Sequence, residues 1–295
     1  MRPGSGATGL GGEQVEGHHA VHELLLAGRR QVRSVWVAAG QQEAGAGQIV
    51  ALARRLGAPV HLKSPAALSG AATTGAPQGV IAWASPVSPV ALVDLLGPGA
   101  SEPSRPSAGG ELKGLPGPGR APFLLVLDGV TDPGNFGALL RTAACAGVSG
   151  VVVARHRAAP LTPAALKAAA GAVERVPIAL VAGIPAALQQ VSRAGVWTVG
   201  LDPAGETDLW TTAVLDGPVA LVLGSEGDGL AHLVRQRCDV LACIPQAGAL
   251  GSLNVAAAGA VACFEVARRR ATTTAGGAAP GSKGRANRPG DRRPG

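Results

Sequence analysis

The feature that most constrains the fold is the alternation of short apolar runs and helical segments in the second half of the chain. Apolar runs that resemble strands buried on both faces lie at 123–127, 150–154, 176–181, 196–201, 219–223 and 240–244. Helical patterns between or after them lie at 136–146, 163–170 (capped by Thr162), 185–194, 230–237 and about 252–270. This order predicts a parallel α/β sheet with helices on both faces, over residues 122–270.

A smaller α/β unit is predicted for residues 13–96. Helical patterns at 18–27 and 48–56 end at glycines, and strand-like runs lie at 32–38, 60–62 and 79–84. Residues 97–121 are dominated by Gly, Pro and Ser, which predicts a flexible linker between the two units. Residues 1–12 are of low complexity, and we expect them to be disordered.

The positive charge is concentrated at the end of the chain. The formal net charge is +7, and residues 268–295 hold eight basic residues and one acid, which leaves 18 basic and 18 acidic residues before them. We expect 271–295 to be a disordered basic tail that attracts polyanions such as RNA without sequence preference. The alternative is that the tail only improves solubility.

Composition excludes several other classes. The chain has no Tyr, 3 Phe and 4 Trp, which disfavours a base-stacking platform of the RNA-recognition-motif kind. The four cysteines form no C-x-x-C pair and have no His at zinc-finger spacing, so we expect reduced core thiols and no metal. No signal peptide and no membrane-length apolar run are present, and we expect a cytoplasmic protein without a membrane segment.

Three glycine-rich loops follow predicted strands, where ligands bind in open parallel sheets. They contain DPGNFGALLRTA (132–143), LVLGSEGDGL (221–230) and IPQAGALGSLNVAAA (244–258). Each polar residue in them allows a structural and a functional interpretation. Asn135 is either a helix cap or a cleft residue, and Arg141 is either a solvated residue or a phosphate contact.

The later loops allow the same two interpretations. Glu226 is either a turn residue or an acceptor for a cationic partner. Ser252 and Asn254 either cap the last helix or expose ligand-binding groups. A G-x-G-x-x-G match at 4–9 follows no strand, so a nicotinamide dinucleotide site is not supported.

Together and in this order, the three segments resemble the three motifs of the SpoU (TrmH) family of RNA 2′-O-ribose methyltransferases. The stretches GHHAVHELLLAG and APQGVIA also resemble the small L30e-like substrate-binding domain of the ribosomal branch, whose members methylate guanosine in 23S rRNA. The resemblance implies a trefoil-knotted parallel-sheet methyltransferase domain after a small α/β substrate-binding domain. It also implies an S-adenosylmethionine cofactor, an RNA substrate and a homodimer packed through the knot region.

The same resemblance assigns residues. Cofactor contacts fall on the backbone of Gly224, Ile244 and Leu253. The catalytic set is Asn135, Arg141, Glu226, Ser252 and Asn254. In this set, Arg141 orients the ribose and its phosphate. Because an arginine is too basic to act as the proton acceptor, we expect RNA phosphate or water to take the proton.

The sequence departs from the family pattern where Ala256, Ala169 and His19 replace the usual hydroxyl or amide residues. Two alternatives stay open. One is the same chemistry on tRNA or on an antibiotic-target site of rRNA. The other is a non-catalytic RNA-binding protein that retains the knot, although loss of Asn135, Arg141 or Glu226 would be its signature and all three are present.

Overall fold

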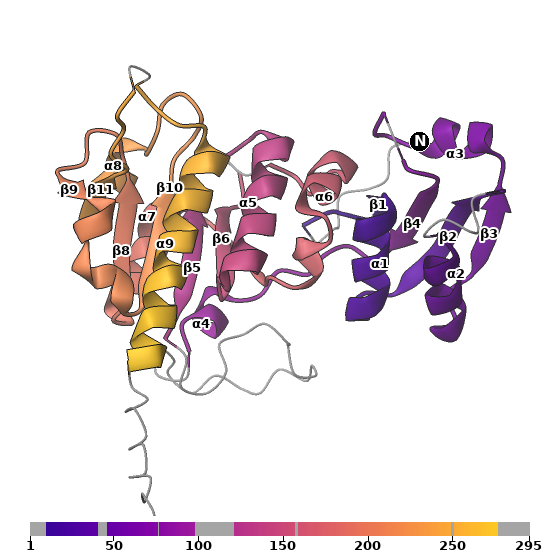
Figure 1. The fold of residues 1–295 in the computed structure, drawn as a ribbon, viewed down its shortest axis with the longest axis horizontal. Coiled ribbons are helices and arrows are strands. Elements are labelled where there is room, and N and C mark those ends of the chain that lie inside the picture. Colours follow the sequence, from indigo (N-terminus) through magenta and orange to yellow (C-terminus); the bar gives the residue numbers. More distant parts are fainter. Residues whose placement is uncertain are drawn as a thin grey trace, which may run out of the picture.

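The computed structural model describes residues 10–40, 46–75, 77–97, 121–156, 159–248 and 251–276. It contains two separate sheets (Figure 1). The predicted linker between them lies outside these residues, except for Gly97 and Ala121, as do residues 1–9 of the N-terminal segment and 277–295 of the tail.

The small sheet has four strands in the order β1-β4-β2-β3, with only β2 and β3 parallel. The strands are β1 (Gln14–Glu16), β2 (Val32–Ala38), β3 (Val60–Lys63) and β4 (Val80–Ala84). Helices α1 (His18–Ala27) and α2 (Ala46–Arg55) bury their apolar residues against one face. The short helix α3 (Pro65–Ala71) packs through Leu68 on the other face.

The large sheet has seven parallel strands in the order β7-β6-β5-β10-β8-β11-β9. They are β5 (Phe123–Leu127), β6 (Gly150–Ala154), β7 (Ile178–Val181), β8 (Trp197–Leu201), β9 (Thr207–Asp208), β10 (Val219–Leu223) and β11 (Val240–Cys243). Because β5, β6 and β10 are buried along their whole length, both faces must be covered by helices.

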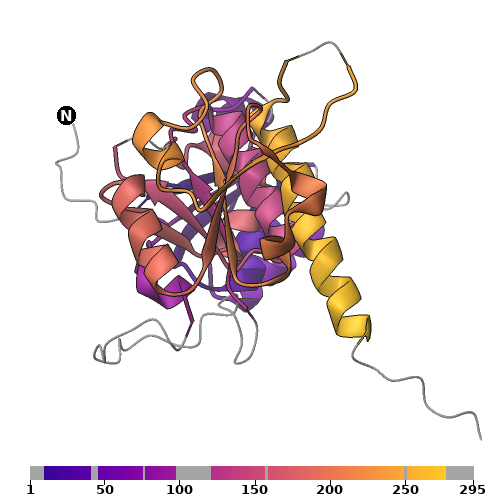
Figure 2. The same cartoon turned by 90° about the vertical axis from the view of Figure 1, so that its left-hand side faces the viewer.

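One face is covered by α5 (Pro133–Ala146) and α9 (Val255–Gly276), and α6 (Pro163–Ala169) packs between α5 and the small domain. The other is covered by α4 (Leu92–Leu95), α7 (Ile184–Arg193) and α8 (His232–Arg235). Figure 2 shows α9 lying along the side of this domain. Short 3₁₀ turns lie at Ala172–Glu174, Leu209–Thr211 and Ala213–Asp216. The parallel α/β sheet predicted from the sequence is confirmed.

The ends of the predicted segments need correction. Helix α9 continues to Gly276, so the first six residues assigned to the disordered tail are helical. Residues 10–12, assigned to the disordered N-terminus, are packed: Leu10 N donates to Val87 O, and Gly11 forms a bridge with Leu161. No local sequence signal predicts these backbone contacts, because their partners lie far along the chain.

The two domains are held together by a buried ion pair. The Arg30 guanidinium lies 2.5 Å from the Glu174 carboxylate, and the two side chains are 5% and 2% exposed. Arg30 also donates to the carbonyls of Gly12 and Ser85. Burial raises the pKa of Glu174, and the positive charge of Arg30 opposes that shift. The pair therefore fixes α1 and its sheet against the 3₁₀ turn that follows α6.

All four cysteines are free. Cys263 is buried, and burial raises the pKa of its thiol to about 12. Burial likewise raises the pKa of Cys238 to about 12. Cys145, which the sequence placed in the core, is exposed on α5, because it lies on the face of that helix turned away from the sheet.

Candidate active site

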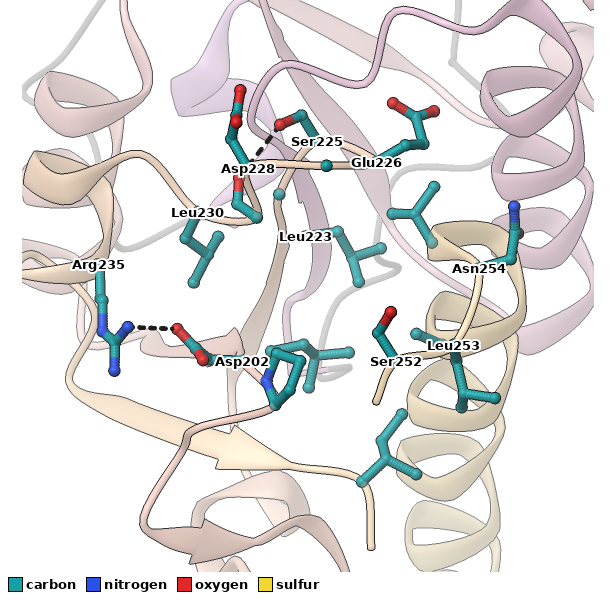
Figure 3. Close-up of a pocket in the computed structure, with 18 of the residues that line it drawn as sticks. Asp202, Leu223, Ser225, Glu226, Asp228, Leu230, Arg235, Ser252, Leu253 and Asn254 are labelled. Atoms are coloured by element: carbon teal, nitrogen blue, oxygen red, sulfur yellow. Dashed lines mark hydrogen bonds and ion pairs between the residues drawn. The ribbon is translucent and has the colours of Figure 1, made fainter. Parts of the chain in front are cut away.

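Three loops meet at the carboxyl ends of the strands in the large sheet and enclose a cavity of about 480 Å³ (Figure 3). They follow β8, β10 and β11. The volume is within the range of about 300–1,000 Å³ found for small-molecule sites. This is the place where ligands bind in open parallel sheets.

The cavity has an apolar wall and a polar rim. The apolar lining comes from Leu201, Leu223, Leu230, Ala242, Ile244, Leu253, Val255 and Ala258. Acidic groups come from Asp202, Glu226 and Asp228, and Arg235 lies 2.9 Å from Asp202 across the rim. The site therefore offers flat apolar surface for a ring system together with acceptors for hydroxyl groups or cationic groups.

The loop after β10 folds tightly onto itself. Ser225 and Gly229 exchange two backbone hydrogen bonds, and a Cβ atom at Gly224 would lie 2.1 Å from the carbonyl carbon of Gly229. Only glycine allows this approach. The Asp128 carboxylate, at the end of β5, accepts a hydrogen bond from Ala231 N at 2.9 Å and fixes the end of the loop.

A chain of side-chain hydrogen bonds joins the three predicted motifs. Asn135 Nδ2 donates to Glu226 Oε1 at 2.9 Å, and Asn254 Nδ2 donates to Asn135 Oδ1 at 3.1 Å. Asn254 Oδ1 accepts from the backbone N–H groups of Ala256 and Ala257. Because a carboxylate can only accept, each amide in the chain has one satisfying orientation. Residues 91 and 119 positions from Asn135 are thereby fixed in one constellation.

The structure changes the interpretation of the helix caps. Asp132, not Asn135, caps α5, because its side chain accepts from Asn135 N at 2.7 Å. The Asn135 side chain is free to join the chain described above. Asn254 caps α9, and its side chain also takes part in that chain and lines the cavity. Ser252 lines the cavity.

The predicted cofactor positions Gly224, Ile244 and Leu253 all line the cavity. Arg141 does not: it lies exposed on α5, outside the cavity lining. The sequence reasoning missed Asp202 and Arg235. Asp202 directly follows β8, so the rule that ligand sites follow parallel strands was the signal that could have found it.

Two absences apply to the described residues. No group of three or more His, Cys, Asp or Glu side chains is arranged to hold a metal ion there. None of the helices in the described part of the chain combines the length and apolar character that crossing a bilayer requires.

Comparison with known proteins assigns both domains. Residues 122–264 match the family model described as SpoU rRNA Methylase family, and residues 14–90 match RNA 2′-O ribose methyltransferase substrate binding. The 23S rRNA (guanosine-2′-O-)-methyltransferase RlmB of Pseudomonas syringae is 37% identical over 88% of this chain and 96% of its own. The Pseudomonas aeruginosa RlmB is 38% identical over 88% and 97%. The chain belongs to the SpoU family.

Solved SpoU structures share the fold. The SpoU methyltransferase AviRb from Streptomyces viridochromogenes, in complex with the cofactor AdoMet, has a TM-score of 0.68 and 26% identity, covering 88% of this chain and 90% of that one. An AdoMet-bound rRNA methyltransferase from Sinorhizobium meliloti has a TM-score of 0.67 and 27% identity, covering 86% of each. The resemblance stated from the sequence motifs is confirmed, and this SpoU chain is a methyltransferase.

Proposed function

We propose that the chain transfers a methyl group from S-adenosylmethionine to a ribose 2′-hydroxyl, that of a guanosine in 23S rRNA. The observation that carries this proposal is the hydrogen-bonded chain Glu226–Asn135–Asn254 beside the cavity. Relatives named for this reaction match nearly the whole chain.

The cavity residues fit S-adenosylmethionine. The apolar wall around Ile244 and Leu253 suits an adenine ring, and Asp202 suits ribose hydroxyls. The carboxylates of Glu226 and Asp228 suit a cationic group. When bound, the cofactor supplies a methyl group on a sulfonium. The remaining steps depend on how this chain holds the RNA.

Asn135 and Asn254 act as positioning residues. Their amides bridge α5, the β10 loop and the start of α9, so the wall beside the methyl donor keeps one geometry. Holding reactants in an attack geometry contributes about 7–11 kcal/mol in favourable cases, which allows catalysis without a strong base. Glu226 anchors the chain, and Ser252 orders the loop that lines the cavity.

Arg141 binds the target nucleotide from outside the cavity. Its guanidinium is exposed on the helix that also carries Asn135. A guanidinium is planar and can donate two parallel hydrogen bonds to the oxygens of one phosphate group. Arg141 orients the ribose and its phosphate, and RNA phosphate or water accepts the 2′-hydroxyl proton.

The knot is supported by the path of the chain. The connection from β8 to β10 passes outside β11, where its β9 pairs with the outer edge of that strand. Later in the same connection, the carbonyls of Trp210 and Thr212 accept hydrogen bonds from Arg269 on α9. The segment from β11 into α9 threads through this connection and forms a trefoil knot.

A homodimer completes the proposal. Phe264 is 51% exposed on α9. The rest of this helix is rich in alanine, which suits close packing against a second copy. Light scattering of the purified chain tests it. Phe264→Asp is expected to give a monomer, and a wild-type monomer would contradict the dimer.

Labelled methyl transfer tests the function. We expect the purified protein to bind S-adenosylmethionine in calorimetry and to label unmodified 23S rRNA, with the label recovered as 2′-O-methylguanosine. Unmodified tRNA and 16S rRNA are the matched substrates. Preferential labelling of tRNA would identify tRNA as the substrate in place of 23S rRNA. RNA binding without methyl transfer to any RNA would identify the chain as a non-catalytic RNA-binding protein.

A further inference from the structure

The small sheet has one face that is only partly covered. The strand register places Trp83 opposite Ser34, and Trp36 opposite both Ile81 and His61, on the face turned away from α1 and α2. Helix α3 covers this face near Ala38 and Ile81 through Leu68.

Two indoles pack against the cluster of Ala38, Leu68 and Ile81 and remain partly exposed. The rings of Trp36 and Trp83 meet edge to face, with centroids 4.8 Å apart at 61°. The low aromatic content of the chain therefore does not remove every stacking surface, because two of its four tryptophans lie together on one sheet face.

Positive charge lies directly beside these rings. Lys63 Nζ is 4.6 Å from the centroid of the Trp36 ring, and His61, in register with Trp36, is exposed. Among the described strand residues on this face, Glu16 is the one acidic residue. Its carboxylate is buried and accepts hydrogen bonds from the backbone and hydroxyl groups of Thr73 and Thr74. The exposed part of the face is thus aromatic and cationic.

The charge of the chain is divided in the same sense. Residues 13–90 contain six Lys and Arg against four Asp and Glu, whereas residues 122–276, which run to the end of α9, contain eleven against eleven. Within these two ranges, the net positive charge therefore lies on the small domain. A polyanion approaching the folded domains is attracted to the small one.

We propose that the tryptophan face, formed by Trp36, Trp83, His61 and Lys63, binds an unpaired segment of the RNA substrate. Bases stack against the indoles, since every base offers a π-face to an aromatic ring, and Lys63 pairs with a neighbouring phosphate. This inference rests on the proposed function and names the residues through which the small domain takes RNA. The buried pair Arg30–Glu174 fixes that domain, so a segment held on the face has a set distance to the cavity.

Binding measurements on the full-length protein test the proposal. The probe is a fluorescent single-stranded RNA of about ten nucleotides, within the site sizes of single-strand binders, with the same sequence as a duplex for comparison. Trp83→Leu is expected to weaken single-strand binding about 5- to 100-fold, and Trp83→Phe to retain most of the affinity because a phenyl ring still stacks. Lys63→Gln is expected to weaken binding and reduce the salt slope by about one.

Two variants serve as matched controls. Trp197→Leu removes another exposed tryptophan, at the start of β8, and Arg54→Gln removes an exposed charge on α2, on the covered side of the small sheet. Trp197→Leu is expected to bind the probe like the wild type, and Arg54→Gln to lose less affinity than Lys63→Gln. If Trp83→Leu does not fold, as judged by thermal unfolding, the comparison of Lys63→Gln with Arg54→Gln decides the question.

Turnover separates this inference from the proposed function. Trp83→Leu is expected to raise the KM for 23S rRNA while kcat at saturating RNA and the Kd for S-adenosylmethionine stay unchanged. If Trp83→Leu methylates rRNA with the wild-type KM, the proposed role of the tryptophan face is wrong and the proposed function is unaffected. Equal affinity of Trp83→Leu and Trp197→Leu, or preference for the duplex, overturns the role of the tryptophan face as well. A protein that binds the single strand through Trp83 but methylates no RNA contradicts the function alone.

Discussion

Asn254 has two roles that substitution can separate. Its Oδ1 caps α9 by accepting from Ala256 N at 2.8 Å and Ala257 N at 3.3 Å, whereas its Nδ2 donates to Asn135 Oδ1 at 3.1 Å. Asn254→Ala removes both. Loss of the cap costs about 0.5–2 kcal/mol, which lowers the thermal midpoint by about 2–4 °C per kcal/mol in a domain of this size.

Asn254→Ser keeps the cap and removes the link. A serine hydroxyl still accepts from the first turn of α9, but it is too short to reach Asn135. We expect its stability to stay near the wild type and its methyl transfer to fall about 10- to 100-fold, as for loss of correct positioning at a reacting centre.

Thr162→Ala is the matched control. Thr162 caps α6 by accepting from Ala165 N at 3.2 Å and is outside the hydrogen-bonded chain. It should lose a similar amount of stability and keep its activity. The assays are thermal unfolding and labelled methyl transfer at saturating RNA. Wild-type turnover in Asn254→Ser, or activity that simply follows stability across the three variants, would show that the link from Asn254 to Asn135 does not contribute to turnover.

Three further predictions follow from the same structure. Arg141→Ala is expected to abolish methyl transfer and leave the Kd for S-adenosylmethionine unchanged in calorimetry, because Arg141 lies outside the cavity lining; an active variant would exclude its role. Glu174→Gln leaves the buried Arg30 without its counter-charge, so denaturant unfolding should show a loss of about 3–5 kcal/mol, and an unchanged midpoint would contradict the interdomain pair. Hydrogen bonding to Arg268 lowers the pKa of Glu265 from 4.5 to about 2, so its carboxylate stabilises the fold above pH 4.5 and loses that effect as the pH falls toward 2. Glu265→Gln should therefore be less stable than the wild type at pH 7, with the difference in thermal midpoint closing across that window; a constant difference would exclude the carboxylate's charge as the cause.

Local patterns were sufficient for most of the large sheet. Strands such as β5, β6 and β10 are uniform apolar runs, and glycine marks the end of α5 at Gly147, so their bounds follow from the chain itself. The cap of α5 was also readable: Asp132 followed by Pro133 at the first helical position is a better cap signal than Asn135.

Long-range contacts were beyond such patterns. Arg30 and Glu174 are 144 positions apart, and nothing near either residue indicates that they pair. Helix α3 is only seven residues long and buries one leucine, so it has too few apolar positions to establish a period. The three motifs could be assigned to one site by resemblance, but the order of hydrogen bonds among Glu226, Asn135 and Asn254 required the structure.

Mapping of ribose methylation in 23S rRNA shows whether this chain methylates a guanosine there. Ribosomal RNA from a strain that lacks this chain is compared, by primer extension and by mass spectrometry of nuclease digests, with RNA from the same strain carrying the wild type or Arg141→Ala. We expect one 2′-O-methylguanosine to be lost with the chain, to return with the wild type and to stay absent with Arg141→Ala. An unchanged methylation pattern in 23S rRNA, or a modification restored by Arg141→Ala, would contradict this expectation.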